Sequence, residues 1–250
     1  MHLTDDTILV TGGGSGIGAG LATALHRAGN RVVIAGRRRD ALDAVAREHP
    51  GMTCYAVDLA DPASVRTFAA EVVDRHPDLN VLVNNAGIMP FEDLTDPRTD
   101  VIQAVCATNL VGPLLLTAEL LPTLRAAPRA AIVNVTSALG FVPMARMPTY
   151  CATKAALHSY TQSLRSQLRR TSVRVIEIPP PRVYTRGEPE DADGLGVASF
   201  VDEALALMAA HPSDGEIVVA AARHLCDAAS RGEYDEVYAA VNPDVERTTP

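Results

Sequence analysis

Tyr150 and Lys154 are the two residues of this sequence best suited to moving a proton. They stand four positions apart in a stretch of helical composition, so their side chains share one helical face, about 5–6 Å apart at Cβ. A free tyrosine has a pKa near 10, and lowering it to about 7 requires roughly 4 kcal/mol of differential stabilisation of the phenolate. A lysine cation one turn away supplies part of it. The pair therefore predicts proton exchange between Tyr150 and a substrate oxygen.

A glycine-rich turn at positions 11–18 predicts a site for dinucleotide phosphates. A strand-like run over 7–11 leads into this turn, and a helical stretch follows at once. Glycine lets the backbone turn tightly and approach a pyrophosphate, which the helix N-terminus then faces. A turn without a ligand is the alternative, which the position between a first strand and a first helix disfavours. The expected cofactor-binding residues here are Gly12, Gly14, Ser15, Gly16, Ile17 and Gly18.

The turn has the form T-G-x-x-x-G-x-G, and the chain thereby resembles the short-chain dehydrogenase/reductase family. Further motifs follow in the family's order. They are Asn84-Asn85-Ala86-Gly87, then Asn109, Ser137, and the pair Tyr150 and Lys154. The resemblance covers about residues 7–220. The segments 176–180 and 215–219 also resemble the DltE-like branch of bacterial short-chain oxidoreductases, from which no substrate can be carried over.

The resemblance implies an α/β fold and a reaction. It implies one NAD(P)-binding Rossmann domain over 1–250, with a doubly wound parallel sheet of about seven strands and helices on both faces. The implied reaction moves a hydride between nicotinamide C4 and a carbonyl or secondary alcohol carbon. Tyr150 then gives or takes the proton of the substrate oxygen, Ser137 hydrogen-bonds that oxygen, and Lys154 also reaches the nicotinamide ribose. Asn109 is expected to hold a water that links Lys154 to solvent.

The resemblance also implies contacts with the rest of the cofactor. Asp58 and the Leu59 amide would bind adenine, although Asp58 fits the cap of a turn equally well. The residues Asn85, Ala86 and Gly87 would cover the adenosine ribose and brace the sheet, with a local Asx turn as the alternative. Val183 and Thr185 would bind the nicotinamide carboxamide. The family's glycine before them is replaced by Pro181, which fixes φ and removes one amide.

Arginines at the end of the second predicted strand favour NADP(H) over NAD. Enzymes that use NAD usually place an acid there for the ribose 2′-OH. This chain has Arg37 and Arg38 instead, and either could bind a 2′-phosphate. The alternative is a solvated basic helix start with Asp40 as its N-cap.

Strand-length apolar runs alternate with helical stretches, which is typical of βαβ units around a parallel sheet. The predicted strands are 7–11, 31–35, 52–57, 79–83, 130–136, 173–178 and 216–220. The predicted helices are 16–28, 40–48, 62–76, 98–125, 150–170 and 200–210. A substrate-binding loop is expected over 184–198, within which 184–196 is expected to be mobile, and a C-terminal extension over 223–250. Residues 141–147 fit either a substrate pocket or the core, and His158 fits a helix surface or subunit contact better than the active site.

Composition narrows the classes of function. The net charge of −8 over 250 residues gives no basic face for nucleic acid. The four cysteines form no CxxC pair, so free thiols in the cytoplasm and no metal site are expected. An acidic start and the lack of an apolar run near 18 residues predict no signal peptide and no membrane partner. The resemblance implies a homodimer or homotetramer formed through helices 98–125 and 150–170.

Two other functions stay open besides an NADP(H)-dependent alcohol dehydrogenase or carbonyl reductase acting on a small molecule. The same fold could serve as a non-catalytic dinucleotide-binding regulator, although an intact Ser137, Tyr150 and Lys154 set argues against this. It could also catalyse epimerisation or dehydration.

Overall fold

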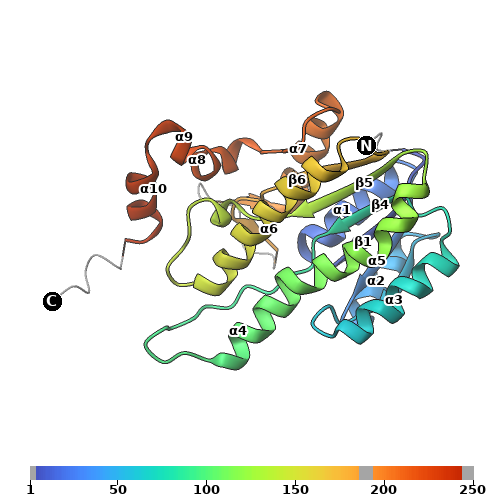
Figure 1. Ribbon diagram of the computed structural model, residues 1–250, viewed down its shortest axis with the longest axis horizontal. Helices are drawn as coiled ribbons and strands as arrows, with labels where there is room; N and C mark the ends of the chain where they lie inside the picture. The colour runs from blue at the N-terminus through green and yellow to red at the C-terminus, as the bar shows by residue number, and fades with distance from the viewer. Residues whose placement is uncertain (1–3, 186–193, 244–250) are drawn as a thin grey trace.

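A six-stranded parallel sheet forms the centre of the protein. The computed structural model describes residues 4–185 and 194–243 (Figure 1). The strands run in the order β3-β2-β1-β4-β5-β6. Their bounds are β1 (Thr7–Thr11), β2 (Arg31–Gly36), β3 (Thr53–Ala56), β4 (Val81–Asn84), β5 (Ala130–Val135) and β6 (Val173–Ile178). Branched apolar residues dominate the central strands because helices cover both faces of the sheet.

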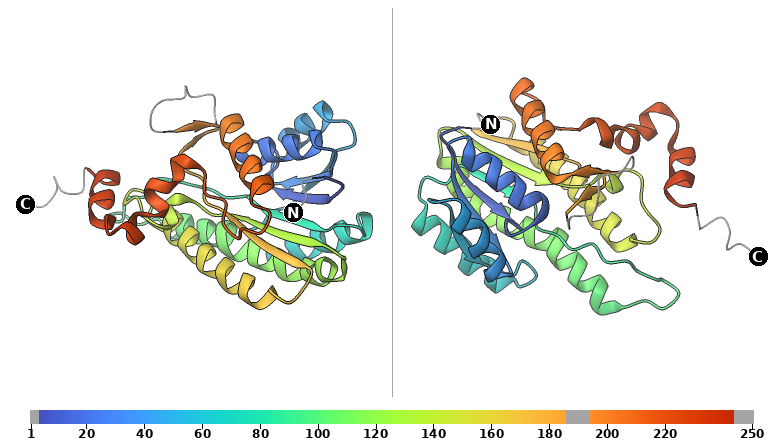
Figure 2. Two further views of the ribbon diagram at one scale, coloured as in Figure 1. Left: turned by 90° about the horizontal axis from the view of Figure 1, so that it is seen from above. Right: turned by 180° about the vertical axis from the view of Figure 1, so that it is seen from behind.

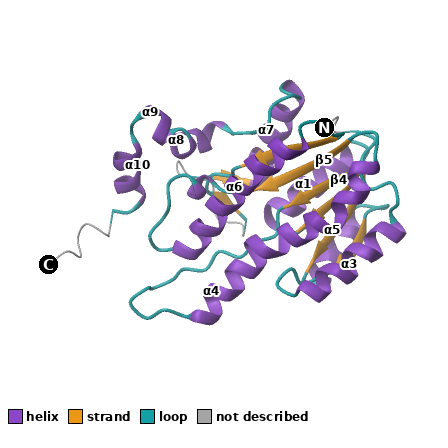
Figure 3. Cartoon of the chain, viewed as in Figure 1, coloured by secondary structure: helices purple, strands orange, loops and turns teal. Residues whose placement is uncertain are grey.

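Helices cover the two faces as the doubly wound prediction requires (Figures 2 and 3). The helices of one face are α1 (Gly16–Arg27), α2 (Arg39–Glu48) and α7 (Val197–Ala210). Those of the other face are α3 (Pro62–Arg75), α5 (Gly112–Ala126) and α6 (Pro148–Leu168). Along β1, Ile8 and Val10 pack toward the first face and Leu9 toward the second, which gives two separate cores. The predicted fold class is confirmed.

The prediction of a seventh strand over 216–220 is wrong. Only Glu216 pairs with β6, through a single bridge to Glu177. The amide of Glu177 donates to the Gly215 carbonyl and that of Ile217 to the Glu177 carbonyl, each at 2.8 Å. A parallel ladder would next need a donor from Pro179, which has no N–H. The pairing therefore stops after one residue.

The long helix predicted over 98–125 contains a π-helical turn. It consists of α4 (Thr99–Cys106), the π segment η1 (Ala107–Val111) and α5. The Gly112 amide donates five residues back to the Ala107 carbonyl. In a regular α-helix the Asn109 carbonyl would accept from residue 113, which is a proline. Proline therefore accounts for a widened turn at Asn109, and such turns are frequent at functional sites.

This helical stretch is also apolar. Thr99–Ala126 is 28 residues long and contains an 18-residue window with a mean hydropathy of 1.7, enough by length and composition to cross a membrane. The sequence expectation that no such run exists is therefore wrong. The same property is found in core helices of soluble proteins, and this stretch packs on α3 and α6.

Two predicted segments are only partly described. A short parallel pair, β7 (Val183–Tyr184) and β8 (Leu195–Gly196), frames the expected substrate loop, and residues 186–193 of that loop lie outside the described residues. The C-terminal extension forms α8 (Arg223–Cys226), α9 (Ala228–Arg231) and α10 (Tyr234–Val241), and its description ends at residue 243. These helices follow the short turn η3 (Ala220–Ala222).

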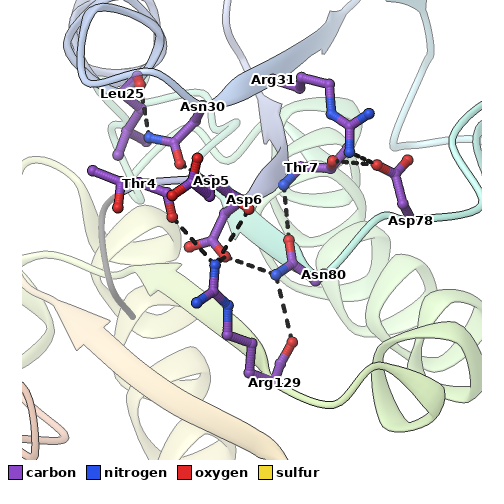
Figure 4. Close-up of polar contacts among 10 residues, drawn as sticks. All are labelled: Thr4, Asp5, Asp6, Thr7, Leu25, Asn30, Arg31, Asp78, Asn80 and Arg129. Atoms are coloured by element: carbon purple, nitrogen blue, oxygen red, sulfur yellow. Dashed lines mark hydrogen bonds and ion pairs between the residues drawn. The ribbon is translucent and has the colours of Figure 1, made fainter.

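A polar network joins the amino ends of the strands (Figure 4). The Asn80 side chain accepts from the Thr7 amide at 2.8 Å and donates to the Asp6 carboxylate at 2.7 Å. Asn30 accepts from the Asp6 amide at 3.0 Å and donates to the Leu25 carbonyl at 2.7 Å. Arg129 lies 3.3 Å from the Asp6 carboxylate. We call these residues (Asp6, Thr7, Asn30, Asn80 and Arg129) the amino-end network.

Candidate active site

Ser137, Tyr150 and Lys154 meet at the carboxyl end of the sheet. Ser137 follows β5 in extended conformation and caps η2 (Ala138–Gly140), its Oγ accepting from the Leu139 amide at 3.1 Å. Tyr150 lies in the first turn of α6, and Lys154 follows one turn later. The Lys154 Nζ lies 5.7 Å from the centre of the Tyr150 ring and donates to the Val135 carbonyl at 2.8 Å. The structure therefore brings together the three residues predicted to carry the chemistry.

Burial shifts the pKa values of Tyr150 and Lys154. It raises the pKa of Tyr150, while a hydrogen bond with the Ser137 hydroxyl acts in the opposite direction. Lys154 is 4% exposed, and burial lowers its pKa to about 8. Both shifts disfavour the charged forms. A bound positive charge beside Tyr150 would therefore have a large effect on its phenolate.

The side chain of Asn109 is occupied by the backbone of Ile88. Its Oδ1 accepts from the Ile88 amide and its Nδ2 donates to the Ile88 carbonyl, both at 2.8 Å. A Cβ on Gly87 would lie 3.3 Å from the Asn109 Oδ1 and 3.8 Å from the Lys154 Nζ. The Asn109 side chain thus fixes the segment after β4 beside Lys154. The Asn109 backbone carbonyl has no α-helical donor, because residue 113 is a proline without an N–H.

The glycine turn is built against the end of β4. Gly12 has a φ of +70°, a region that favours glycine, and a Cβ there would lie 2.8 Å from the Asn85 Nδ2. The Thr11 hydroxyl accepts from the amides of Asn85 and Ala86 at 3.0 and 3.1 Å. The Asn85 side chain donates back to the Thr11 carbonyl at 2.9 Å. Sequence reasoning did not single out Thr11, although it begins the T-G-x-x-x-G-x-G pattern.

The far side of the glycine turn faces the segment after β6. Gly16 has a φ of +55°, and a Cβ there would lie 3.0 Å from the Thr185 Cγ2. Thr185 follows β7, which includes Val183. Pro179, Pro180 and Pro181 precede this segment. The chain there still contacts η2, because the Pro180 carbonyl accepts from the Ala138 amide at 2.9 Å. The predicted nicotinamide contacts therefore lie beside the predicted phosphate turn.

Of the predicted adenine and 2′-phosphate residues, Arg37, Arg38 and Asp58 are exposed, whereas Leu59 is buried. Arg38 donates to the Ser15 hydroxyl at 2.8 Å, and Arg37 is exposed. The first residue of α2 is Arg39, so Asp40 is not the N-cap considered from the sequence. Asp58 accepts from the Ala60 amide at 3.0 Å, as a turn cap would.

Two features near Ser137 could not be derived from spacing. Glu177 is fully buried; it accepts from the Thr136 hydroxyl at 2.7 Å, and the His158 Nδ1 lies 2.9 Å from both of its oxygens. His158 is thus paired with a buried acid, neither on a bare helix surface nor beside Tyr150. Together with Glu216, these two residues form a group whose possible metal-ligand atoms lie within 4.8 Å of one another. The Glu216 carboxylate also lies 3.4 Å from Arg165. Each of these side chains thus has a partner within the protein.

Comparisons with known proteins agree with this geometry. The family model described as short chain dehydrogenase matches residues 6–196. The chain is 38% identical to the uncharacterized oxidoreductase DltE of Bacillus subtilis (strain 168), over 97% of this chain and 98% of that protein.

Solved structures agree as well. A short chain dehydrogenase from Burkholderia cenocepacia J2315 in complex with NADP has a TM-score of 0.83 at 26% identity, with all of both chains covered. A metagenomic short-chain oxidoreductase in complex with NADP has a TM-score of 0.76 at 30% identity, covering 88% of this chain and 98% of that one. Together with the motifs and the fold, these matches show that the chain belongs to the short-chain dehydrogenase/reductase family of oxidoreductases.

Proposed function

We propose that the protein is an NADP(H)-dependent oxidoreductase acting on a carbonyl or secondary alcohol carbon of a small molecule. The observation that carries this proposal is the meeting of Ser137, Tyr150 and Lys154 beside the glycine turn. A proton donor, a hydrogen-bond donor and a cation around one point are what reduction of a carbonyl requires. Bound nicotinamide supplies or accepts the hydride at C4.

The residues of the chain would handle the oxygen and its proton. In the reducing direction, Tyr150 gives its phenolic proton to the substrate oxygen as the carbon gains the hydride, so that an alcohol forms. The Ser137 hydroxyl donates a hydrogen bond to the same oxygen. Lys154, fixed by the Val135 carbonyl, stabilises the resulting phenolate. Oxidation of an alcohol reverses each step.

The proton of Tyr150 must then be replaced through the interior. Lys154 is buried, so solvent reaches it only through an ordered path. The Asn109 carbonyl, which has no N–H partner at Pro113, is the acceptor that a water beside Lys154 would use. This retains the role expected for Asn109 but assigns it to the backbone, because Ile88 occupies the side chain.

Local geometry supports binding of a dinucleotide. Gly12 and Gly16 are left-handed, and a Cβ on Gly12, Gly16 or Gly18 would lie within 3.0 Å of neighbouring atoms, so this tight turn requires glycine, as the cradle of a pyrophosphate does. Asp58 and Leu59 would bind adenine, and Val183 and Thr185 the carboxamide. Arg37 and Arg38 favour NADP(H), and Arg38 already lies against Ser15 of the glycine turn. Related structures in complex with NADP support the same choice.

A panel of ketones and alcohols, followed through NADPH absorbance, tests the proposal. Oxidation of NADPH in proportion to alcohol formed is the expected result. Binding of NADPH without turnover on any substrate would instead support a regulator. Substrate conversion with no net change in NADPH would support epimerisation or dehydration, the other reactions that this fold accommodates.

We also propose that the enzyme works in the cytoplasm as a homodimer or homotetramer. Val111, on the helical stretch 99–126, is 45% exposed although it is apolar. An apolar side chain left exposed on this stretch is a position that a second copy could cover. Light scattering of the purified chain measures this directly, and a monomer at micromolar concentration would contradict it.

A further inference from the structure

The segment 138–147 is the connection between two of the proposed reactive residues. It begins directly after Ser137 and ends just before α6, whose first turn carries Tyr150. Apart from the short turn η2 it has no regular secondary structure. Both of its ends are thus fixed at the groups that bind the substrate oxygen. A substrate held there must lie against this segment, which we call the connecting wall.

One buried side chain of the C-terminal extension binds the backbone of the connecting wall. Asn242 follows α10 and is 5% exposed. Its Oδ1 accepts from the Ala145 amide at 2.6 Å, and its Nδ2 donates to the Pro143 carbonyl at 3.0 Å and to the Tyr238 carbonyl at 2.9 Å. Both donors of the amide are therefore used. The wall's own backbone groups find in Asn242 the partners that regular structure would otherwise supply.

An apolar cluster supports the same contact. Val142 of the connecting wall is fully buried, and it packs with Ala228 and Val237 of the C-terminal extension. Tyr238 and Val241 of α10 pack against this cluster. Figure 1 shows α8–α10 beside the loop that leads into α6. The C-terminal extension therefore packs on the wall between Ser137 and Tyr150 through both polar and apolar contacts.

A different side chain holds the start of α6. The Glu92 carboxylate accepts from the Thr149 amide at 3.1 Å and from the Thr149 hydroxyl at 2.7 Å. The Glu92 amide donates to the Arg146 carbonyl at 2.9 Å. Tyr150, next to Thr149, thus keeps its own anchor when Asn242 is changed. Glu92 therefore holds the last part of the wall and the start of α6, whereas Asn242 holds the wall at Pro143 and Ala145.

We propose that Asn242 is a positioning residue that determines substrate specificity by holding the connecting wall. The proposal rests on the proposed oxidoreductase function and adds to it the element that selects the substrate. Loss of the Asn242 amide frees the Pro143 carbonyl and the Ala145 amide, while Glu92 continues to hold Thr149 beside Tyr150. The expected effect is therefore on KM and on discrimination between substrates, with little change in kcat.

Asn242→Asp is the direct test. It retains the acceptor for the Ala145 amide and places a carboxylate oxygen against the Pro143 and Tyr238 carbonyls, which lose their side-chain donor. We expect KM for an active ketone to rise about tenfold. The kcat and the dissociation constant of NADPH should stay within about twofold. The ratio of kcat/KM for a small and a bulky ketone should also change at least about threefold.

Asn30→Asp is the matched control. It makes the same change in a buried asparagine of the amino-end network, keeping the acceptor for the Asp6 amide and losing the donor to the Leu25 carbonyl. It should lower the melting temperature without changing the ratio of kcat/KM values. Asn242→Ser, which places a neutral hydroxyl where the amide was, provides a second variant if Asn242→Asp does not fold.

The outcomes separate this inference from the proposed function. Wild-type protein that turns over neither a ketone with NADPH nor an alcohol with NADP⁺ would overturn the proposed function, and this inference with it. An active wild type whose Asn242 variants keep both KM and the ketone ratio would overturn this inference alone. Equal changes in the Asn242 and Asn30 variants would also overturn it, because they would show a general loss of stability.

Discussion

The two ends of the central sheet use polar groups in opposite ways. At the amino end, Asn80 and Asn30 bond to Asp6, Thr7 and the adjoining backbone at 2.7–3.0 Å, and so connect β1 with the chain around it. At the carboxyl end, Lys154 is buried with its pKa lowered to about 8. The amino-end network stabilises the fold. At the carboxyl end, the fold keeps the Lys154 cation next to Tyr150 although its burial lowers stability.

The backbone differs in how closely left-handed glycines approach other segments of the chain. A Cβ on Gly12 or Gly16, at the carboxyl end, would lie 2.8 Å from the Asn85 Nδ2 or 3.0 Å from the Thr185 Cγ2, whereas a Cβ on Gly29, at the amino end, would meet nothing within 4 Å. Buried charge concentrates at functional sites because a ligand makes use of it. The comparison teaches that the carboxyl end is built for a partner that carries charge and hydrogen bonds. The amino end already contains its own partners.

The largest effect on stability is expected at Lys154. The unfolded chain binds this proton up to about pH 10.5, and the folded chain only up to about pH 8. The buried cation therefore makes the folded state less stable below pH 8, and this cost disappears as the pH rises from 8 to 10.5. Relative to Lys154→Met, the wild type should gain up to roughly 3 kcal/mol over that range. Urea unfolding at several pH values measures the difference, and a pH-independent difference would contradict it.

Replacement of Arg37 and Arg38 by alanine should alter cofactor choice. Loss of charge-assisted hydrogen bonds to a 2′-phosphate raises KM for NADPH about 10- to 100-fold. KM for NADH should change less than about threefold, because NADH lacks that phosphate. Steady-state kinetics with both cofactors provide the measurement. A similar rise for both would show that the arginines do not read the phosphate.

The smallest effect on function is expected at the amino end. Arg129→Ala removes a half-exposed partner of the buried Asp6, which keeps its hydrogen bond from Asn80. The free energy of unfolding should fall by about 1 kcal/mol. Turnover and NADPH affinity should remain unchanged. An altered KM for NADPH would break the distinction between the two ends.

Local pattern predicted much of the fold, and proline explains where it failed. The bounds of β1 and β6 agree with the apolar runs over 7–11 and 173–178. The seventh strand fails at Pro179 and the regular α-helix at Pro113, each a missing N–H that could have been read from the sequence. The predicted bounds followed the pattern of apolar residues and did not take these two prolines into account.

The candidate site was predicted only where its residues are close in sequence or belong to a motif. Spacing placed Tyr150 and Lys154 on one helical face. Asn242 and Ala145 are 97 residues apart, and no periodicity indicates that contact. Glu177 was likewise missed, because a lone acid in a predicted strand gives no sign that His158 lies 2.9 Å away. Such contacts depend on tertiary packing.

Tyr150→Phe is the most direct test of the central claim that Tyr150 transfers the proton. The variant retains the ring and removes only the phenolic oxygen. With an active ketone, kcat should fall by about 10²- to 10⁴-fold, as expected for loss of a general acid. The dissociation constant of NADPH, measured by fluorescence titration, should stay within about twofold of the wild-type value. Undiminished turnover by Tyr150→Phe would contradict the account.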